Sequence, residues 1–541
     1  MKVETVPFPD QKPGTSGLRK AVPVFRQPRY LENFVQSIFD TVPELAGDAL
    51  VLGGDGRFFM DEAIQTILRM ASANGVARVL VGRGGLLSTP AASGLIRACG
   101  AQGGIILSAS HNPGGPEGDF GVKFNAANGG PASASVTDAI FRNACAIKQY
   151  RITEASPYDL SAVGEGRIGD MIVEVVDSVS QYIAMMERLF DFDRIGAMLR
   201  AGAPMRFDAM NAVTGPYAHA LFEERLGAPR GTVLNGVPKP DFGGLHPDPN
   251  PVYAKALIDL MRENRDIAFG ACSDGDGDRN LIIGPGGMVV SPSDSLAVLA
   301  ANAHLAPGYA EGLKGVARSM PTSRAVDRVA AAMKLPLYET PTGWKFFGNL
   351  LDEGRITLCG EESAGTGSNH IREKDGVWAV LLWLNVVAAR GLSVEAILKE
   401  HWQRFGRDYY ARHDYEEIDT AAAEGVMRHL RDQLPTLAGR AVGGLEVERA
   451  DEFSYEDPVD GSVAKGQGIR IFFRDDSRVV YRLSGTGTQG ATLRIYLERY
   501  EPDSARHGLD SGEVLADLAR VAAELAELPA RTGRNAPSVI A

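Results

Sequence analysis

Cysteine is scarce in this 541-residue chain, and its distribution excludes two kinds of framework. No two cysteines form a Cys-x-x-Cys pair, and the four lie far apart at Cys99, Cys145, Cys272 and Cys359. Such spacing provides neither a disulfide scaffold nor a zinc site. Because this usage fits a reducing compartment, we expect a cytoplasmic protein.

Long apolar runs are also missing. The longest, residues 376–389, is too short and too interrupted to span a bilayer. The N-terminal residues MKVETVPFPDQ include no apolar core of the kind that a signal peptide needs. We therefore expect no membrane span and no export signal.

Positive charge is in deficit. Lysine and arginine number 56 against 68 aspartates and glutamates, which leaves a formal charge of −12. Nucleic-acid binding needs clustered cations, so this balance argues against a nucleic-acid partner. It does not exclude a small anionic substrate, because a few cations in a cleft can attract one.

The length exceeds what one hydrophobic core supports, and several domains are expected. From residue 49 onward, ALVLGG, ARVLVGR and GGIILSAS have the pattern of strands, and the segments between them have the pattern of helices. This βαβαβ order predicts parallel strands covered by helices, with ligands outside the carboxyl ends of the strands.

The same alternation of strands and helices recurs twice further along the chain. The strands MRFDAM and DIAFGACSD enclose helical segments, and GVARSM and ITLCGEES do the same further along. After about residue 402 the pattern becomes α+β, with two helices and the strands GIRIFFRDD, SRVVYRLSG and TLRIYLERY. Domain boundaries are predicted near residues 190, 300 and 405.

The stretch LSASHNPGGPEGDFGVKFN, residues 107–125, follows one of these strands. Ser110 stands where the apolar run ends, ahead of a segment rich in glycine and proline. It is either a reactive hydroxyl held at the end of a strand or the first polar residue of a turn.

A second strand leads into CSDGDGDRN, in which single glycines separate Asp274, Asp276 and Asp278. In an extended segment alternate side chains point the same way, and glycines let the backbone curl around an ion. Carboxylates alone favour Mg²⁺ or Ca²⁺. An EF-hand is excluded because Arg279 and Pro285 stand where it needs glycine and glutamate. The alternative is an acidic surface turn.

Two further loops are rich in polar groups. GEESAGTGSNHIREKDG, residues 360–376, offers donors and acceptors that suit a sugar phosphate, although such a loop is often only solvated. KPGTSGLRK, residues 12–20, includes Thr15 and Arg19, and its simpler interpretation is a flexible turn.

The loop RLSGTGTQGATLR, residues 482–494, has the G-x-G-x-x-G spacing of dinucleotide-binding sites. That fingerprint requires a helix after the last glycine, whereas ATLRIYLERY alternates as a strand. We therefore expect a loop between strands that holds a phosphate with Arg482, Ser484, Thr486 and Arg494. A glycine-rich hairpin without a ligand is the alternative.

Taken together, the loops resemble the α-D-phosphohexomutase family, most closely its phosphoglucomutase branch. The matching segments are PGTSGLRK, SASHNPGGPEGDFGVKFN, SDGDGDRN, PTGWKFFGNL, GEESAGTGSNHIREKDGVWAVL and RLSGTGTQGATLRIY. The resemblance implies an α/β protein of three related αβα sandwich domains with mixed sheets, plus a smaller C-terminal α+β domain, around a central cleft. The alternation by itself suggests purely parallel sheets.

The resemblance implies a role for each domain. Residues 1–190 would hold a phosphoserine, 191–300 a metal, 301–405 the sugar and 406–541 the phosphate of the substrate. The implied reaction interconverts α-D-glucose 1-phosphate and glucose 6-phosphate, with glucose 1,6-bisphosphate as intermediate and activator. The implied partners are small-molecule hexose phosphates, and the expected state is a monomer or weak homo-oligomer.

Ser110 is, on this resemblance, the phosphorylated residue. It would bind Mg²⁺ together with Asp274, Asp276 and Asp278, so that the cation offsets charge on the phosphoryl oxygens. Arg19 would assist catalysis there.

A general base must take the proton of the attacking sugar hydroxyl. The candidates are His111, Lys123 and Lys374, and their order is open, because a lysine would first need a lowered pKa.

The resemblance also implies a set of contacts to the sugar and its phosphate. These substrate-binding residues are Thr15, Arg19, Asp278, Arg279, Thr342, Gly343, Glu361, Ser363, Lys374, Arg482, Ser484, Thr486 and Arg494.

One departure from the family pattern is visible, since Ala364 stands where animal phosphoglucomutases carry an aromatic residue. We expect it to loosen the sugar packing slightly. Two alternatives stay open: a mutase for another hexose phosphate such as mannose phosphate, and a non-catalytic sugar-phosphate-binding relative.

Overall fold

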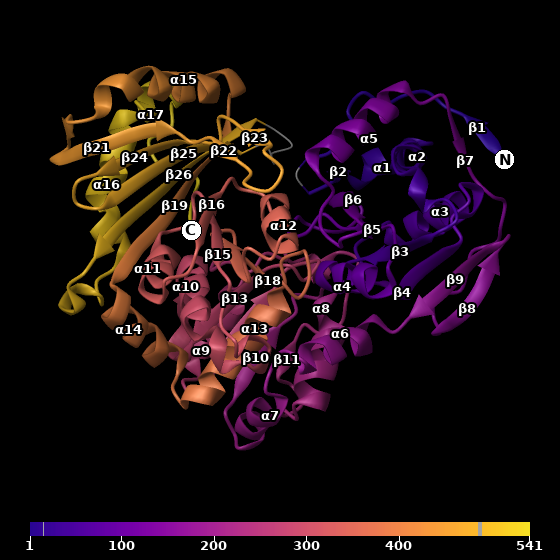
Figure 1. The fold of residues 1–541 in the computed structure, drawn as a ribbon, viewed down its shortest axis with the longest axis horizontal. Coiled ribbons are helices and arrows are strands. Elements are labelled where there is room, and N and C mark those ends of the chain that lie inside the picture. The colour runs from indigo at the N-terminus through magenta and orange to yellow at the C-terminus, as the bar shows by residue number, and fades with distance from the viewer. Residues whose placement is uncertain (15, 485–489) are drawn as a thin grey trace. The chain divides into compact units, whose positions relative to one another are not determined.

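The computed structural model of the chain describes residues 1–14, 16–484 and 490–541 (Figure 1). Its backbone contacts form two compact units. Unit 1 comprises Met1–Pro292, Asn302–Lys314 and Gly354–Val394. Unit 2 comprises Ser293–Ala301, Gly315–Glu353 and Glu395–Ala541. The domain boundaries near residues 190, 300 and 405 stay predictions.

Unit 1 opens with a seven-stranded mixed sheet in the order β2-β6-β5-β3-β4-β9-β8. Its four central strands are parallel, whereas β2, β6 and β8 run antiparallel to their neighbours. The mixed sheet is thus confirmed and the purely parallel sheet is wrong, because the connection from β5 to β6 is too short for a crossover. The bounds are β2 (Leu18–Ala21), β3 (Ala49–Gly54), β4 (Arg78–Leu86), β5 (Gly103–Leu107), β6 (Asp119–Ala126), β8 (Gly164–Ile168) and β9 (Met171–Val176).

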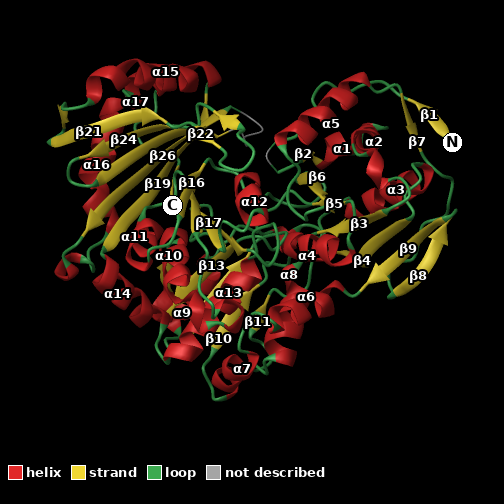
Figure 2. Ribbon diagram, in the orientation of Figure 1, coloured by secondary structure: helices red, strands yellow, loops and turns green. Residues whose placement is uncertain are grey.

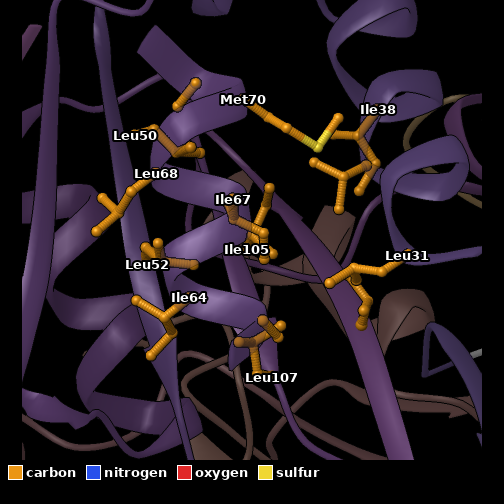
Figure 3. Packing of buried hydrophobic residues seen from close by; sticks show 14 of the residues in the cluster. Leu31, Ile38, Leu50, Leu52, Ile64, Ile67, Leu68, Met70, Ile105 and Leu107 are labelled. Carbon is orange, nitrogen blue, oxygen red and sulfur yellow. The ribbon is translucent and has the colours of Figure 1, made fainter. Parts of the chain in front are cut away.

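Helices cover both faces of this sheet. Successive strand residues point to opposite faces, and the central strands are apolar on both, so each face packs against helices. Leu50 and Leu52 of β3 pack with Ile105 and Leu107 of β5 against α2 and α3 (Figure 3). On the opposite face, Ile96 of α4 lies over Gly104 of β5. The helices of this region are α1 (Val22–Phe25), α2 (Tyr30–Thr41), α3 (Met60–Ala73), α4 (Thr89–Cys99), α5 (Ala134–Ala146), α6 (Ser178–Glu187) and α7 (Phe192–Arg200).

The helix α4 begins where the sequence predicts it. The side chain of Ser88 accepts a hydrogen bond from the N–H of Ala91, and Pro90 lies in the first turn. The helix ends at Gly100, whose φ of +66° is left-handed. These local signals fix both ends of α4, which lies beside α6 (Figure 1).

The second sheet of unit 1 has the order β11-β10-β12-β13-β14 and is also mixed. The strands β10, β11 and β12 are parallel, and β13 returns antiparallel to β12. The turn between β12 and β13 holds the three aspartates. The bounds are β10 (Met205–Asp208), β11 (Val233–Leu234), β12 (Phe269–Ser273), β13 (Asn280–Gly284), β14 (Met288–Val290), α8 (Thr214–Ala218), a π-helix (His219–Arg225) and α9 (Lys255–Glu263).

Unit 1 also includes an antiparallel hairpin and the helix that follows it. The hairpin consists of β17 (Leu358–Glu361) and β18 (Gly365–Ser368), and α13 (Gly376–Arg390) is buried over most of its length. The loop between β18 and α13 includes Glu373 and Lys374. This hairpin and loop therefore present most of the segment 360–376.

Unit 2 combines a parallel strand pair with a large antiparallel sheet. The pair consists of β15 (Val316–Ser319) and β16 (Leu337–Thr340), and α11 (Ala325–Met333) connects them. The sheet order is β20-β21-β24-β25-β26-β19-β27, in which β20 is Ala441–Val442 and β27 is Val539–Ile540. Its strands are yellow in Figure 2. The main bounds are α10 (Pro292–Asn302), α12 (Lys345–Asp352), α14 (Val394–Phe405), β19 (Arg407–Ile418), α15 (Thr420–Leu437), β21 (Leu445–Glu452), β24 (Ile469–Phe473), β25 (Ser477–Ser484), β26 (Ala491–Glu501) and α16 (Ser511–Leu525).

A strand, not a helix, follows the glycine-rich segment. The residues from Ala491 onward form β26, which pairs antiparallel with β25. The dinucleotide-binding alternative fails on this point, because its fingerprint places a helix N-terminus there. The predicted loop between two strands is confirmed, although residues 485–489, Thr486 among them, lie outside the described residues.

Buried ion pairs connect β15 and α11 to the sheet within unit 2. The Nη2 atom of Arg478 lies 2.6 Å from Oε2 of Glu498, and both side chains are almost fully buried. Arg324 donates its backbone N–H to the same carboxylate, and Arg328 pairs with Asp408 at 3.1 Å. Removal of one partner would leave a buried charge uncompensated, so this network favours unit 2 as one body.

All four cysteines are free, with Cys99 and Cys145 exposed and Cys272 and Cys359 buried. Among the described residues, no single helix is long and apolar enough to cross a membrane, and one bent pair, Gly376–Arg390 with Val394–Phe405, meets the length and composition test only jointly.

Candidate active site

Ser110 lies just beyond the carboxyl end of β5, in a tight turn. Its side chain is 2 % exposed and its φ is +52°, a left-handed conformation that few non-glycine residues adopt. The N–H of Ser110 donates to Oγ of Ser108 at 2.7 Å, and that hydroxyl donates to Oδ2 of Asp55 at 2.6 Å. These bonds hold the unusual backbone in place, as is common at functional sites.

Arg57 holds the same turn through hydrogen bonds to backbone carbonyl groups. Its Nη2 donates to the carbonyl of Ser110 and its Nη1 to the carbonyl of Asp119, each at 2.7 Å. Its Nε pairs with Asp55 at 2.9 Å, and both side chains are fully buried. Sequence reasoning missed this pair. Its signal is GGDGR, which places Asp55 and Arg57 directly after the strand ALVLGG.

The three aspartates converge as predicted, but the geometry differs from an extended run. One carboxylate oxygen from each of Asp274, Asp276 and Asp278 lies within 4.8 Å of the others. The backbone makes a turn, in which the N–H groups of Asp278 and Arg279 both donate to Oδ1 of Asp274 at 3.0 Å. Gly277 has a φ of +83°, so the curl of the turn, and not strand alternation, brings the carboxylates together.

Ser110 and the acidic turn are in direct contact. The Oγ of Ser110 donates to Oδ2 of Asp274 at 2.8 Å. Burial, and then the charges of Asp278 and Asp276, raise the pKa of Asp274 well above its usual range. The cations Lys123, Lys374 and Arg19, together with the hydrogen bond from Thr89, lower the pKa of Asp276 in spite of its burial.

The donor set fits a divalent metal ion. Oδ1 of Asp276 and Oδ1 of Asp278 are buried and have no hydrogen-bond partner among the described residues. Together with oxygens of Asp274 and Ser110 they form an all-oxygen set, which hard cations such as Mg²⁺ prefer.

Cationic side chains surround the acidic turn. Nζ of Lys374 lies 3.1 Å from Oδ2 of Asp278, and Nη1 of Arg279 lies 3.6 Å from Oδ1 of Asp248. The Nε atoms of Arg19 and Arg279 are buried without a hydrogen-bond partner in the described part of the chain. Unpaired guanidinium N–H groups in a site of this kind can hold an anion.

The three candidate bases lie in different electrostatic environments. Lys123 is engaged with Glu373 at 2.8 Å. Burial lowers the pKa of Lys374, but the carboxylates of Asp278, Glu361 and Glu373 together outweigh burial and the pKa is raised. Burial, and then the positive charges of Arg279 and Arg19, lower the pKa of His111 well below its usual value.

The lowered pKa favours the neutral form of His111, whose ring lies next to the serine. Its Nδ1 lies 3.4 Å from Oγ of Ser110, at the limit of a hydrogen bond. A neutral imidazole can accept a proton, whereas an ammonium group held by a carboxylate cannot.

The segment 360–376 is tied to the acidic turn by backbone contacts. The N–H of Asn280 donates to the carbonyl of Ala364, and the N–H of Gly376 donates to the carbonyl of Gly277, each at 3.0 Å. Glu361 ends β17 and is buried, and Ser363 is half-buried in the turn after it. Unit 1 thus brings together three motifs that are far apart in sequence.

The remaining candidate residues belong to unit 2 or lie outside the described residues. Arg482 and Arg494 stand directly opposite each other on β25 and β26, and Ser484 is opposite Thr492. Like charges directly opposite one another destabilise a strand pair, so this arrangement favours a bound anion. Thr342 and Gly343 precede α12, and Gly343 has a φ of +125°. Thr15 and Thr486 lie outside the described residues.

Four family models match consecutive parts of the chain. The α/β/α domains I, II and III of phosphoglucomutase/phosphomannomutase match residues 10–151, 180–287 and 292–405, respectively. The C-terminal domain of phosphoglucomutase-1 matches residues 407–538. The expected three αβα domains with a C-terminal domain are thereby confirmed.

Full-length relatives agree with these matches. The chain is 58% identical over 538 residues to phosphoglucomutase of Rhizobium radiobacter, covering 99% of each chain. It is 52% identical over 559 residues to phosphoglucomutase-1 of Oryctolagus cuniculus, again covering 99% of each. The structure of parafusin, a phosphoglucomutase from Paramecium, in its open form matches with a TM-score of 0.92 and 46% identity, covering 100% of this chain and 99% of that one.

A buried serine bonded to an acidic turn, cations around both, and matches over the whole length all agree with one another. The chain therefore belongs to the phosphoglucomutase family of enzymes, which interconvert glucose phosphates.

Proposed function

We propose that this chain interconverts α-D-glucose 1-phosphate and glucose 6-phosphate by carrying a phosphoryl group on Ser110, with glucose 1,6-bisphosphate as the intermediate. The observation that carries the proposal is the 2.8 Å contact between Oγ of Ser110 and Oδ2 of Asp274, inside a buried all-oxygen cluster. A serine held only for its fold would not need three buried carboxylates beside it, two of which keep an oxygen without a hydrogen-bond partner among the described residues.

In the proposed cycle the phosphorus–Oγ bond of phosphorylated Ser110 breaks as a free sugar hydroxyl attacks phosphorus. The hydroxyl proton passes to a base, and Oγ leaves with the electron pair of the broken bond. The bisphosphate then rebinds in the opposite orientation. Oγ attacks its other phosphorus, the bond between that phosphorus and the sugar oxygen breaks, and the sugar oxygen takes up the proton held by the base. The left-handed turn at Ser110 serves both half-reactions by holding Oγ at one point.

The metal proposed at this site is Mg²⁺, held by Asp274, Asp276, Asp278 and an oxygen on Ser110. When bound, it would neutralise charge on the phosphoryl oxygens. Lys374 pairs with Asp278 and so limits the repulsion within the cluster. Arg19 and Arg279 direct their unpaired Nε–H groups to phosphoryl oxygens in this proposal.

We assign proton transfer to His111 in preference to the two lysines. Lys123 and Lys374 are each paired with a carboxylate, whereas Nδ1 of His111 lies 3.4 Å from the serine oxygen. An acceptor next to Oγ can take the serine proton when Oγ attacks the bisphosphate, and it can return that proton when Oγ leaves.

The remaining candidate residues have proposed roles in binding substrate. In unit 1, Glu361 and Ser363 would contact sugar hydroxyls. In unit 2, Thr342 and Gly343 would contact sugar hydroxyls, and the opposed Arg482 and Arg494 would bind a phosphate together with Ser484 and Thr486. Thr15 is proposed as a further substrate contact.

The decisive test compares Ser110→Ala with the matched variant Ser135→Ala, which changes an exposed serine. With Mg²⁺ and glucose 1,6-bisphosphate, Ser110→Ala should lose conversion of glucose 1-phosphate in a coupled dehydrogenase assay, whereas Ser135→Ala should keep it. Intact-mass measurement should find one added phosphate on the Ser135→Ala protein only. Near wild-type turnover by Ser110→Ala would overturn the phosphoserine mechanism.

The small side chain of Ala364 is a reason to test other hexose phosphates in the same assay. Ala364 has a φ of +69° and a small side chain next to the sugar-contacting turn, so the site can be less selective than one with an aromatic residue there. A panel of glucose, mannose and N-acetylglucosamine 1-phosphates, compared by kcat/KM, would rank these substrates. We expect glucose 1-phosphate to be preferred, and we place the enzyme in the cytoplasm, in keeping with its four free thiols.

A further inference from the structure

A large cavity lies in unit 1 between α4 and α6. Its volume is about 860 Å³, within the range of small-molecule sites. It opens over the amino ends of β3 and β4, whereas Ser110 follows the carboxyl end of β5. None of the residues proposed to bind substrate or metal is among its lining residues. We call it the α4–α6 cavity, and its main lining residues are Leu95, Arg97, Cys99, Tyr182, Met185 and Arg188.

The lining combines an apolar floor with a cationic rim. Leu95 and Met185 contribute to the floor, and Arg97 and Arg188 stand at the exposed ends of α4 and α6. Within the described part of the chain, the guanidinium of Arg188 makes no hydrogen bond or ion pair. The acidic residue of the lining, Glu174, is already neutralised by Arg78 at 2.5 Å. The rim therefore has an excess of positive charge.

The helix α4 connects this cavity to the acidic turn. At its amino end, Oγ1 of Thr89 donates to Oδ2 of Asp276 at 2.6 Å, and the N–H of Thr89 donates to the carbonyl of Asp276 at 2.9 Å. One turn later, Oγ of Ser93 accepts the N–H of Arg372 at 3.0 Å. One rigid helix thus links Arg97 to a proposed metal ligand.

The helix α6 connects the cavity to the loop that carries Lys374. The hydroxyl of Tyr182, a lining residue, donates to Oδ1 of Asp375 at 2.6 Å. Asp375 also accepts the N–H of Trp378, which caps α13, and its Oδ2 lies 3.1 Å from Nε2 of His370. Because Asp375 directly follows Lys374, a displacement of α6 would also move the Lys374 amine that pairs with Asp278.

We propose that the α4–α6 cavity is a regulatory site for a small organic anion, one that joins a carboxylate or phosphate group to an apolar body. The apolar body would lie on Leu95 and Met185, and the anionic group would bind Arg97 and Arg188. Occupancy is linked to turnover, because α4 and α6 contact the acidic turn and the Lys374 loop. This site goes beyond the proposed function and its binding does not depend on the phosphoserine cycle.

Cys99 provides a direct readout of the cavity, because its exposed thiol is part of the lining. Iodoacetate and iodoacetamide both alkylate a thiolate: the S–C bond forms, iodide leaves, and the thiol proton goes to solvent. Only iodoacetate is anionic. We expect the iodoacetate-to-iodoacetamide rate ratio at Cys99, followed by peptide mass spectrometry, to fall about two- to threefold at low salt in the double variant R97Q/R188Q.

Cys145 is the internal control for this measurement, since it is the other exposed thiol. Its ratio should be the same in both proteins. An unchanged ratio at Cys99, or an equal fall at Cys145, would overturn the cationic character of the cavity.

Two probes test whether the cavity binds an organic anion. Benzoate and phenylphosphonate should slow the iodoacetamide labelling of Cys99 in the wild-type enzyme and not in R97Q/R188Q. Protection by benzoate favours a carboxylate ligand, and protection by phenylphosphonate alone favours a phosphate ligand. If neither probe protects Cys99, the site does not exist as proposed.

The linkage to turnover has its own test. The protecting probe should change the kcat of the wild-type enzyme and leave that of R97Q/R188Q unchanged, whereas competition at the active site would raise KM in both proteins. Without probe, R97Q/R188Q should have wild-type kcat. In Tyr182→Phe the probe should still protect Cys99 but change kcat less. Protection without any change in wild-type kcat would overturn the linkage.

Discussion

The Oγ atom of Ser110 and the Oδ2 atom of Asp274 are 2.8 Å apart, although 164 residues separate them in the chain. The serine belongs to the turn after β5 and the aspartate to the turn after β12, so each comes from the carboxyl end of a strand in a different sheet. The contact brings a hydroxyl that can carry a phosphoryl group to the carboxylates that can hold its cation. The first prediction concerns those carboxylates.

Asp276→Asn should weaken Mg²⁺ binding while leaving the fold intact. Its Oδ1 is a buried atom with no hydrogen-bond partner among the described residues, and loss of its charge removes part of the repulsion around Asp274. We expect Mg²⁺ affinity, measured by titration calorimetry, to fall at least about 10-fold. Thermal stability without metal should not fall. Asp259→Asn, on an exposed helix, is the control, and unchanged Mg²⁺ affinity in Asp276→Asn would contradict the assignment.

Arg57→Gln should destabilise unit 1, because it leaves the fully buried carboxylate of Asp55 without its counter-charge. Loss of one partner of a buried ion pair costs about 3–5 kcal/mol. The substitution also removes a donor to the carbonyl of Ser110. Urea unfolding should show a lower midpoint, and the double variant Asp55→Asn/Arg57→Gln should recover part of the loss. A double variant no more stable than Arg57→Gln would argue against this explanation.

Gly365→Ala should impair turnover without unfolding the protein. A Cβ atom at this position would lie 2.3 Å from Cδ of Lys374, so the lysine side chain must move away from Asp278. Displacement of a catalytic-site group by about 1 Å can reduce the rate roughly 100-fold. Gly348→Ala is the matched control, since its added Cβ meets no atom within 4 Å. If both variants keep wild-type kcat with glucose 1-phosphate, turnover does not depend on the position of the Lys374 side chain.

Titration of Asp408 should lower the free energy of unfolding as pH rises, whereas titration of most carboxylates raises it. Burial, and then the neighbouring charge of Glu498, raise its pKa to about 7. A carboxyl whose pKa is higher in the folded state than in the unfolded state keeps its proton longer when folded. Its contribution to stability is therefore lost as pH rises from about 4 to about 7.

The test of this titration is the difference between Asp408→Asn and the wild-type protein. The variant lacks the titrating group, so its unfolding free energy relative to wild type should rise with pH, by at most about 1.4 kcal/mol per unit. Urea unfolding between pH 4.5 and pH 7.5 measures it. A difference that is flat, or that falls with pH, would show that Asp408 ionises normally.

Much of the local structure follows from local sequence signals. The alternation of ALVLGG and GGIILSAS predicts β3 and β5, and Ser88, Pro90 and Gly100 define α4. The pattern of ATLRIYLERY distinguishes β26 from the helix that a dinucleotide site requires. These features depend on periodicity and capping within a few residues, which the sequence displays directly.

The candidate site was only partly predictable. The motifs around Ser110, Asp274 and Lys374 name the residue types that phosphoryl transfer needs, and their order along the chain identifies the family. Asp55 and Arg57 directly follow the strand ALVLGG, but they were missed because GGDGR does not show that their side chains pair beneath the Ser110 turn. The convergence of the aspartates was predicted from strand alternation and from glycines that let the backbone curl, and the structure shows the curled backbone, with a turn at Gly277.

The sequence by itself indicated many of the helices and strands and the residue types of the candidate site, since these depend on neighbouring residues or on whole motifs. The mixed character of the sheets was expected from the family resemblance and not from the alternation. Only the tertiary structure decided which oxygen of Asp274 meets Ser110, that Lys374 pairs with Asp278, and that a cavity rimmed by Arg97 and Arg188 lies between α4 and α6. Such relations join residues far apart in the chain. They arise when separate elements pack together, and periodicity within any one element does not encode them.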